Sequence, residues 1–210
     1  MQRWPPLRAE AMSEALPSGR AVVLATRNAH KIIEMKRLLE PAGIVVESLP
    51  DDVELPPEDG ATFADNALQK AQTAAADTGR PAIADDSGIE AAALGGAPGV
   101  RSARFAGPQA TDEQNLEKLV LEAPADSRLR YVCALAYVDP DSGEERVFFG
   151  DCRGRLARVR AGSNGFGYDP VFVPDATGDD RTMAELADAE KDAISHRAHA
   201  VRALARWLRV

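Results

Sequence analysis

At residues 82–88 the chain reads Ala82-Ile83-Ala84-Asp85-Asp86-Ser87-Gly88, an apolar segment followed at once by two carboxylates, a hydroxyl group and a glycine. In an open α/β sheet, ligands bind in the crevice beyond the carboxyl ends of the strands. The segment therefore predicts a buried strand that ends at the pair Asp85 and Asp86 and delivers both carboxylates to such a crevice. A polar turn between a strand and a loop is the alternative interpretation.

Strand and helix patterns alternate on both sides of this segment. Short continuous apolar runs are typical of buried strands, and apolar residues repeating every three to four positions are typical of helices. Asn28 is a credible helix cap, and Thr62-x-x-Asp65 and Thr111-x-x-Gln114 have the spacing of capping boxes. The alternation predicts an α/β fold with a mixed sheet. We expect strands at 21–25, 44–46, 82–84, 129–138, 146–150 and 171–173, and helices from Asn28 to Pro41, from Thr62 to Thr78, from Thr111 onward, and one last helix carrying Lys191 and Ser195 to Leu208.

The length and net charge of the chain limit the classes of function that it can have. The chain has 210 residues and a formal net charge of −8, which suits one domain and disfavours a nucleic-acid backbone or an anionic membrane as the main partner. No run of 18 apolar residues is present, so we expect no membrane span. Cys133 and Cys152 lack metal-ligand spacing and predict buried thiols in a reducing cytoplasm. We expect residues 1–19 to be a disordered tail, or the protein to start at Met12 rather than at Met1. A single domain is expected over residues 20–210.

The first candidate site is the turn between the strand at 21–25 and the helix that follows it. Free backbone N–H groups and the positive end of the helix dipole make such a turn a binding site for anions. The lysine one turn into the helix adds a point charge. An ordinary helix cap with a solvated lysine is the alternative. The turn comprises Thr26, Arg27, Asn28, Ala29, His30 and Lys31.

The second candidate site consists of carboxylates. Asp85 and Asp86 follow the strand, and Glu58 lies in an acidic, proline-rich loop over residues 50–61. Mg²⁺ takes hard oxygen ligands, typically one or two protein carboxylates completed by substrate phosphates and water. The His and Cys clusters that zinc requires are absent from the sequence. We therefore expect Mg²⁺ rather than zinc.

The third candidate site is the glycine-rich loop at 162–170, which contains Phe166, Gly167, Tyr168 and Asp169. Aromatic side chains beside flexible glycines can stack on a flat base, and a carboxylate there can accept hydrogen bonds from a ring N–H. The alternative is that the aromatic side chains fill the core.

The fourth candidate site lies near the C-terminus, where Lys191, His196 and Arg197 offer donors to phosphate or to a carbonyl oxygen. A Ser-His hydrolase pair at Ser195 and His196 is rejected, because neighbours on a helix point in different directions and no Gly-x-Ser-x-Gly elbow is present. An anion-binding helix end, a divalent metal, a stacking loop and basic side chains together suit the hydrolysis of a nucleoside polyphosphate.

The ordered motifs of the chain resemble the inosine triphosphate pyrophosphatase family, the XTP/dITP diphosphatases that clear non-standard purine nucleotides. The resemblance covers roughly residues 21–209. It rests on Leu24-Ala25-Thr26-x-Asn28-x-x-Lys31, Gly60-x-Thr62-Phe63-x-x-Asn66-Ala67-x-x-Lys70-Ala71, Ile83-Ala84-Asp85-Asp86-Ser87-Gly88, Gly95-Gly96-Ala97-Pro98-Gly99-x-x-Ser102-Ala103-Arg104, Gly165-Phe166-Gly167-Tyr168-Asp169-Pro170, Ala184-Glu185-Leu186 and Glu190-Lys191-x-x-Ile194-Ser195-His196-Arg197.

The resemblance implies an elongated two-lobed fold with a long mixed sheet, an active-site groove between the lobes, a homodimer and dependence on Mg²⁺. It also implies roles for residues. The turn from Thr26 to Lys31 would hold the triphosphate, with Lys70 adding charge from a facing helix. Asp86 would be the general base or metal-linked acid beside Ser87, and Glu58 would bind the metal. The base and phosphates would be surrounded by Phe166, Gly167, Tyr168, Asp169, Lys191, His196 and Arg197.

Two positions depart from the pattern of that family. Arg27 stands where many relatives carry glycine, and either contacts phosphate or points to solvent. Arg101 replaces an expected aromatic residue, with no clear consequence for the chemistry.

The leading interpretation is hydrolysis of ITP, dITP or XTP to the monophosphate and pyrophosphate. A pyrophosphatase of the septum-formation-inhibitor type, acting on modified pyrimidines, is the second, but its Ser-Pro-Arg-Arg-like start is missing. A nucleotide-binding regulatory module without turnover is the third.

Overall fold

The computed structural model describes residues 20–208, so the predicted tail over residues 1–19 and the choice between Met1 and Met12 lie outside the described part. The centre of the molecule is a six-stranded sheet in the order β2-β1-β3-β4-β5-β6. Neighbours β2, β1 and β3 are parallel, and β3, β4, β5 and β6 pair antiparallel. The predicted mixed sheet is confirmed. Its strands are β1 (Arg20–Leu24), β2 (Ile44–Ser48), β3 (Ala82–Ala91), β4 (Arg128–Asp139), β5 (Glu144–Leu156) and β6 (Phe172–Pro174).

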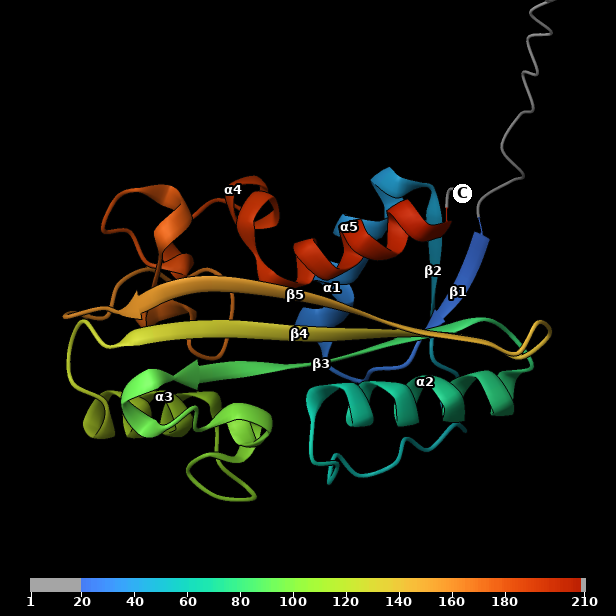
Figure 1. Cartoon of the computed structure of the whole chain (residues 1–210), viewed down its shortest axis with the longest axis horizontal. Helices are drawn as coiled ribbons and strands as arrows, with labels where there is room; N and C mark the ends of the chain where they lie inside the picture. Colours follow the sequence, from blue (N-terminus) through green and yellow to red (C-terminus); the bar gives the residue numbers. More distant parts are fainter. Residues whose placement is uncertain (1–19, 209–210) are drawn as a thin grey trace, which may run out of the picture.

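Helices cover both faces of this sheet (Figure 1). On one face lie α1, α4 and α5, and on the other lie α2 and α3. A 3₁₀ helix over Gly99–Arg104 precedes α3. The bounds are α1 (Ala29–Leu39), α2 (Phe63–Thr78), α3 (Asp112–Glu122), α4 (Asp188–Ile194) and α5 (His196–Leu208).

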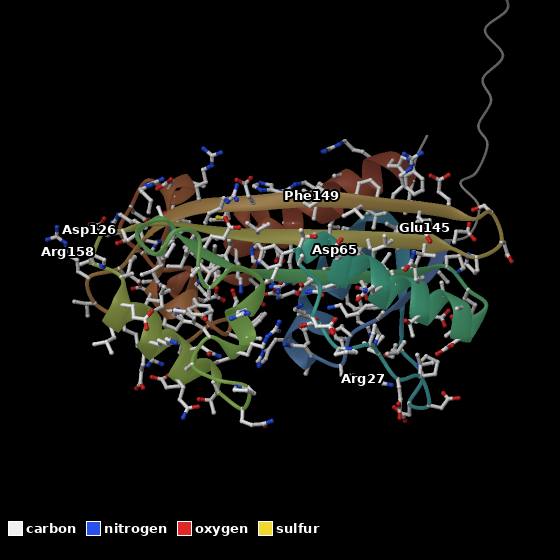
Figure 2. All side chains as sticks on the ribbon, turned by 60° about the horizontal axis from the view of Figure 1, so that its bottom comes forward. Arg27, Asp65, Asp126, Glu145, Phe149 and Arg158 are labelled. Atoms are coloured by element: carbon white, nitrogen blue, oxygen red, sulfur yellow. The ribbon has the colours of Figure 1, made fainter. Side chains whose placement is uncertain are left out.

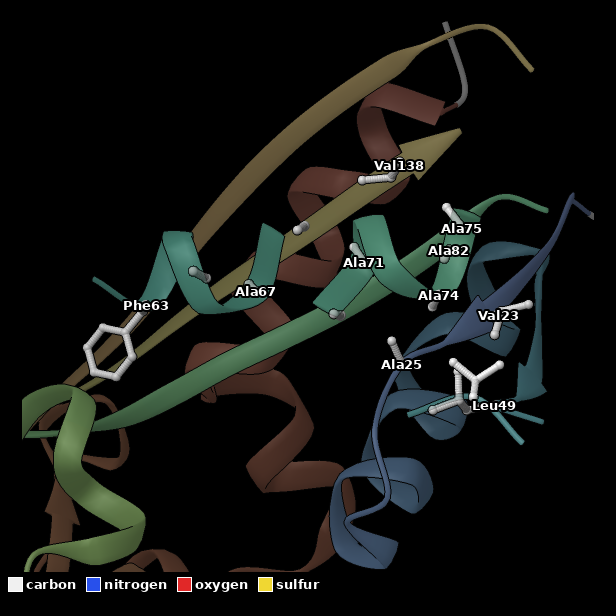
Figure 3. Packing of buried hydrophobic residues seen from close by; sticks show 14 residues of the cluster. Val23, Ala25, Leu49, Phe63, Ala67, Ala71, Ala74, Ala75, Ala82 and Val138 are labelled. Atoms are coloured by element: carbon white, nitrogen blue, oxygen red, sulfur yellow. The ribbon is translucent and has the colours of Figure 1, made fainter. Parts of the chain in front are cut away.

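The helix α2 lies close to the sheet because its inward face is built from alanines. Ala67, Ala71 and Ala74 are fully buried against the sheet (Figure 3). The predicted capping box is present, since the Thr62 side chain accepts from the Asp65 N–H and Asp65 accepts from the Thr62 N–H. Small side chains permit a close approach of backbones, and this brings the polar residues of α2 within reach of β3.

The carboxylate pair does not end a strand, contrary to the sequence-based expectation. β3 continues through Asp85 and Asp86 to Ala91, because β4 pairs with it along its whole length. The parallel neighbour β1 ends opposite Ile83. The crevice therefore opens beyond the carboxyl end of β1, and the two carboxylates stand in the part of β3 that extends past it. Since side chains alternate along a strand, Asp85 and Asp86 face opposite sides of the sheet.

The single last helix predicted from the sequence is wrong, because two helices are present. Ser195 separates α4 from α5 with an extended backbone (φ −68°, ψ 154°), and its Oγ accepts from the Ala198 N–H at 3.2 Å. Lys191 therefore lies on α4, whereas His196 and Arg197 open α5.

The molecule has two lobes, which are joined by β3, β4 and β5. Three apolar clusters form its core. One cluster fills the space between the sheet and α2, and a second lies between the sheet and the pair α1 and α5. The third gathers the far ends of β3, β4 and β5 with α3 and β6. The molecule is elongated along these strands (Figure 1), as expected. In the part of the chain that the structure describes, no helix is long and apolar enough to cross a membrane.

The strand β5 is paired on one side only up to Gly154, where β6 begins to pair with it, and this part carries an exposed aromatic side chain, Phe149, which is 62% exposed (Figure 2). Its neighbour Gly150 faces α5, whose backbone passes so close that a Cβ atom at this position would meet the Ala200 nitrogen at 2.6 Å. The close approach of α5 to β5 places the first turn of α5 over the middle of the sheet, where the two lobes meet.

Candidate active site

A cavity of about 360 Å³ lies where the two lobes meet. Both lobes and the middle of the sheet contribute to its walls. Its lining includes Ala25, Thr26, Arg27, Asn28, Lys31, Leu55, Pro56, Glu58, Lys70, Asp86, Ser87, Gly88, Val100, Ser102, Ala103, Asp112, Tyr131, Phe166, Gly167, Tyr168, Asp169, His196 and Arg197. Most of the predicted site residues thus meet in one place. Ala29, His30 and Lys191 are not among the lining residues.

The turn between β1 and α1 is capped by its own asparagine. Asn28 Oδ1 accepts from the backbone N–H groups of His30 (3.0 Å) and Lys31 (3.2 Å). Thr26 Oγ1 accepts from the Asn28 N–H at 3.2 Å. The expectation of free N–H groups at this helix end is therefore wrong for His30 and Lys31, because the N-cap side chain already satisfies them.

Arg27 is tied to a neighbouring loop, although 46% of its side chain is exposed. Its guanidinium donates to the backbone oxygens of Leu49, Pro50 and Val53, on the loop that follows β2. Figure 2 shows Arg27 beside that loop. The contact was not predictable from sequence, because the partners are backbone oxygens more than twenty residues away.

Asp85 is a fully buried counter-ion beneath the cavity. Its Oδ2 lies 3.0 Å from Lys31 Nζ and 3.2 Å from Arg197 Nε, and it accepts from Ser87 Oγ at 3.1 Å. Burial by itself would raise the pKa of Asp85, but the charges of Lys31, Arg197 and Lys70 outweigh it and hold that pKa well below its usual range. Asp85 therefore stays ionised and holds two cations at the cavity floor.

Asp86 faces the α2 side and lines the cavity itself. Asn66 Nδ2 donates to Asp86 Oδ2 at 2.8 Å, and the Ser87 N–H donates to Oδ1 at 2.9 Å. Burial and the negative charge of Glu58 raise the pKa of Asp86 above its usual range, against the charge of Lys70. The two adjacent aspartates thus have opposite pKa shifts, and a carboxylate with a raised pKa is the better proton acceptor of the two.

Lys70 projects from α2 between these carboxylates. Its Nζ forms an ion pair with Glu58 and donates to the Asp85 backbone oxygen at 2.7 Å. Burial alone would lower the pKa of Lys70, yet the charges of Asp85, Glu58 and Asp86 raise it, so Lys70 is a buried cation at the cavity wall. The loop that carries Glu58 is held on its other side by Arg104, which donates to the Glu58 backbone oxygen at 2.7 Å.

The predicted metal ligands Glu58 and Asp86 line the same cavity. Within residues 20–208 no group of three or more His, Cys, Asp or Glu side chains is arranged to hold a metal ion. The negative charge of Glu58 helps to raise the pKa of Asp86, so the two carboxylates repel each other. They still match the donor set of Mg²⁺, which keeps water and substrate oxygens as further ligands. The residues present fit a magnesium ion that is completed by its substrate.

Phe166 is an aromatic side chain of the cavity wall that already stacks on a ring of the protein. It lines the cavity, lies 5.1 Å from the His30 ring with an interplanar angle of 18°, and has Arg197 Cζ 5.1 Å from its centroid. Gly167 is held by Asp112, which accepts from its N–H at 3.1 Å. Tyr168 is buried, and its hydroxyl donates to the Ser102 backbone oxygen at 2.7 Å, so the core alternative holds for Tyr168.

Asp169 and Lys191 form a buried ion pair. Asp169 accepts from Lys191 Nζ at 2.7 Å and from the Tyr131 hydroxyl at 3.0 Å. It also accepts from the Phe166 N–H at 3.1 Å, which fixes the glycine-rich loop. Lys191 has a second carboxylate partner, Glu34, at 2.6 Å. These residues position Phe166 and the cavity wall, and Asp169 has three donors within the protein.

Glu34 is a residue that the sequence analysis missed. Its two carboxylate oxygens join Lys191 of α4 (2.6 Å) to Arg197 of α5 (2.9 Å). Its position three residues after Lys31 on the same helix was a usable signal, because residues at this spacing share a face. Tyr131 and Asp112 were also missed, the first because a tyrosine in an apolar strand is ordinarily a core residue.

His196 is buried and stacked on Tyr131, with ring centroids 4.7 Å apart and an interplanar angle of 7°. Burial and the positive charges of Arg197 and Lys191 hold the pKa of His196 well below its usual range. The imidazole is therefore neutral near pH 7, with one donor and one acceptor nitrogen. Its Nδ1 is buried and, among the described residues, has no hydrogen-bond partner.

Arg197 makes three hydrogen bonds within the protein. It donates to Ser87 Oγ (2.6 Å), to Asp85 (3.2 Å) and to Glu34 (2.9 Å). The guanidinium therefore joins β3 to α1 beneath the cavity. Of the two adjacent residues at the start of α5, His196 keeps a ring nitrogen unpaired, while Arg197 is largely saturated by the protein.

Known proteins of similar sequence match most of this chain. A dITP/XTP pyrophosphatase of Cutibacterium acnes is 50% identical over 191 residues, which cover 87% of this chain and 93% of that protein. A dITP/XTP pyrophosphatase of Frankia alni is 49% identical over 199 residues, covering 90% of this chain and 96% of that protein.

Solved structures give the same result at the level of the fold. A HAM1 protein from Coxiella burnetii superposes with a TM-score of 0.78 at 40% identity, covering 90% of this chain and 98% of the other. A dITP/XTP pyrophosphatase from Mycobacterium abscessus gives a TM-score of 0.67 at 43% identity, covering 90% of this chain and 100% of the other. The Ham1 family matches residues 22–207, nearly the whole described part. The resemblance seen in the motifs is thereby confirmed, and the chain belongs to the Ham1 family.

Proposed function

We propose that this chain hydrolyses non-standard purine nucleoside triphosphates, dITP, XTP and ITP, to the monophosphate and pyrophosphate. The observation that carries the proposal is the pairing in one cavity of Asp86, a carboxylate with a raised pKa, with the cations Lys31 and Lys70. The relatives named dITP/XTP pyrophosphatases support the substrate class. A purine triphosphate brings negative charge for the cations and a flat ring for Phe166.

In the proposed reaction a water molecule attacks the α-phosphorus. Asp86 accepts the proton of that water, the new bond forms between its oxygen and the α-phosphorus, and the bond to the bridging oxygen of the β-phosphate breaks. The leaving pyrophosphate is neutralised by Lys31 and Lys70, whose positions are set by Asp85 and Glu58. Asn66 holds the Asp86 carboxylate in place from α2.

Mg²⁺ is proposed as the cofactor, with Glu58 and Asp86 as the residues that would hold it. When bound, the ion supplies positive charge to the phosphate oxygens and lowers the cost of bringing a polyanion to a carboxylate-lined wall. Lys70, which is already paired with Glu58, would then be shared between Glu58 and the substrate.

Base selection is proposed to depend on His196 and Phe166. A neutral imidazole that lines the cavity can donate to or accept from the edge of a base. A 6-oxo purine matches a donor there, whereas adenine presents an amino group and would leave the donor unpaired at roughly 1–3 kcal/mol per group.

We also propose that the chain is a homodimer that works in the cytoplasm. The family resemblance supports the dimer, and the exposed Phe149 on strand β5 is compatible with it. The buried free thiols of Cys133 and Cys152 are compatible with a reducing compartment. Light scattering coupled to size-exclusion chromatography would give the mass in solution, and a monomer over the micromolar range would refute the dimer.

A substrate panel tests the proposed function. The purified chain is incubated with Mg²⁺ and with dITP, XTP, ITP, ATP or dCTP, and pyrophosphate and orthophosphate are measured separately. We expect pyrophosphate from the 6-oxo purine nucleotides and little from ATP or dCTP. Release of orthophosphate, or binding of dITP without turnover, would overturn the proposal, and the second result would favour a binding module.

A further inference from the structure

Arg27 joins two segments that the sequence separates by more than twenty residues. The residue follows Thr26 in the turn after β1, where we place the phosphates. Its guanidinium leaves that turn and reaches the loop after β2. There it donates to Leu49 O at 3.0 Å, Pro50 O at 2.6 Å and Val53 O at 3.0 Å.

The contacted loop leads directly to the proposed metal ligand. Four residues separate Val53 from Glu58, and they contain no helix or strand. Leu55, Pro56 and Glu58 line the cavity from this stretch. A segment without regular structure is held only by its individual contacts, so the groups that fix its two ends decide where the Glu58 carboxylate lies.

The far end of the stretch has its own attachments. Arg104 donates to the Glu58 backbone oxygen at 2.7 Å, and the Gly60 N–H donates to Asn66 Oδ1 at 2.8 Å. At the near end, apart from the turn bond from the Val53 N–H to Pro50 O at 3.2 Å, the described hydrogen bonds all come from Arg27. Arg27 therefore supplies the side-chain hydrogen bonds of the near end, beside the burial of Leu49 and Val53 in the apolar core.

The chemistry of this tether requires arginine. A planar guanidinium can address several carbonyl oxygens at once, whereas a lysine ammonium is a compact, strongly hydrated charge on a flexible stem. The additional ion pair with Asp51, at 3.5 Å, involves a fully exposed carboxylate and contributes little. The carbonyl contacts carry the interaction.

We propose that Arg27 is a positioning residue, which ties the phosphate-binding turn to the loop that carries Glu58. This inference rests on the proposed function for its kinetic consequence, but the tether itself is a property of the free protein. The donors of its two terminal nitrogens are directed at the loop. Its loss loosens the stretch from Leu49 to Glu58 and weakens the cavity for the divalent ion, while the chemistry at Asp86 is retained.

Hydrogen exchange followed by mass spectrometry tests the tether in the free, full-length protein. We compare the wild type with Arg27→Ala and Arg27→Lys, and use Arg80→Ala as the matched control, because Arg80 is an exposed arginine of the same lobe that pairs with Glu47. Peptides spanning residues 49–59 should exchange at least roughly tenfold faster in Arg27→Ala, and nearly as fast in Arg27→Lys. The Val53 amide is the main reporter, and Arg80→Ala should leave these peptides unchanged.

Kinetics supply the second readout. In Arg27→Ala the Mg²⁺ concentration for half-maximal activity should rise roughly tenfold, as when a group that orients a metal ligand is removed. At saturating Mg²⁺, kcat and the KM for dITP should stay within about twofold of the wild type. A raised KM for dITP with unchanged exchange in residues 49–59 would make Arg27 a phosphate ligand and overturn the inference. Unchanged exchange with unchanged kinetics would overturn it as well.

The two proposals fail separately. If the wild type releases no pyrophosphate from any nucleotide, the proposed function is refuted, and the exchange comparison still decides whether Arg27 tethers the loop. If the wild type is active but the exchange of residues 49–59 is the same in all four proteins, only the tether is refuted.

Discussion

Replacing Asp86 by asparagine removes the proposed general base and keeps the shape of the side chain. Asn66 Nδ2, which donates to Asp86 Oδ2 at 2.8 Å, can donate equally to the oxygen of the new amide. Lys70 keeps its partners Glu58 and the Asp85 backbone oxygen. The variant therefore retains the cavity wall and its cations but has no group at this position that can accept a proton.

The size of the effect follows from the role assigned to the carboxylate. General-base catalysis contributes about 10²–10⁴-fold, so kcat should fall at least roughly 10²-fold, or about 2.7 kcal/mol at 1.36 kcal/mol per tenfold change. The KM for dITP at saturating Mg²⁺ should not rise by a comparable factor, because the cations Lys31 and Lys70 remain and a negative charge has been removed from their neighbourhood.

The stability of the Asp86→Asn variant should not fall with its activity. The pKa of Asp86 is raised in the folded protein by burial and by Glu58. Its contribution to stability is therefore complete below its unfolded pKa, about 3.9, and is lost as the pH rises through the folded pKa. Near pH 7 the wild type carries the cost of a buried charge that asparagine lacks, so the melting temperature of Asp86→Asn should equal or exceed that of the wild type.

The assay measures initial rates of pyrophosphate release from dITP with saturating Mg²⁺, together with melting curves at pH 4.5 and pH 7. The matched control is Asp77→Asn, an exposed carboxylate of the same helix α2 that does not line the cavity. A kcat for Asp86→Asn close to that of the control, in a folded protein, would refute the assignment of the base.

Three further predictions concern the metal, the base and the buried counter-ion. EDTA should abolish activity and added Mg²⁺ should restore it, whereas a zinc-selective chelator should have no effect; full turnover in EDTA would contradict an oxygen-ligated metal. His196→Ala should lower kcat/KM for ITP by roughly 1–3 kcal/mol and leave the low value for ATP nearly unchanged; equal losses on both substrates would assign His196 to stability alone. Asp85→Asn leaves Lys31 and Arg197 without their buried partner and should destabilise the fold by about 3–5 kcal/mol. Because the folded pKa of Asp85 is lowered, its contribution is present above about pH 3.9 and disappears as the pH falls through the folded pKa, so the melting temperatures of variant and wild type should converge in acid and stay apart near pH 7.

Features that depend on neighbouring residues were predictable from the sequence. The caps at Asn28, Thr62 and Thr111 are all present, because a cap is formed by side chains and N–H groups two or three residues apart. The mixed sheet and the two lobes were also foreseen. These elements bring most of the predicted site residues to one cavity.

The errors come from contacts between distant segments. The length of β3 depends on its antiparallel partner β4, which the segment at 82–88 does not reveal. The guanidinium of Arg27 binds backbone oxygens, and a sequence carries no signal for such an acceptor. The division into α4 and α5 at Ser195 lacks a glycine or proline to mark it.

The partners in the ion-pair network could not be predicted from the sequence either. Lys191 and Arg197 both looked like donors for a ligand, but each meets the carboxylate of Glu34 from a different helix. Whether a basic side chain serves a substrate or a buried acid depends on the tertiary packing. The sequence identified the basic residues correctly and could not assign their partners.

Hydrolysis of dITP in water enriched with ¹⁸O tests the central claim most directly. In the proposed reaction the attacking water lies beside Asp86 and the leaving pyrophosphate lies against Lys31 and Lys70. The new oxygen must therefore enter at the α-phosphorus. Mass spectrometry of the products should therefore find one ¹⁸O atom in the monophosphate and none in the pyrophosphate. Label in the pyrophosphate, or orthophosphate as the first product, would contradict the account.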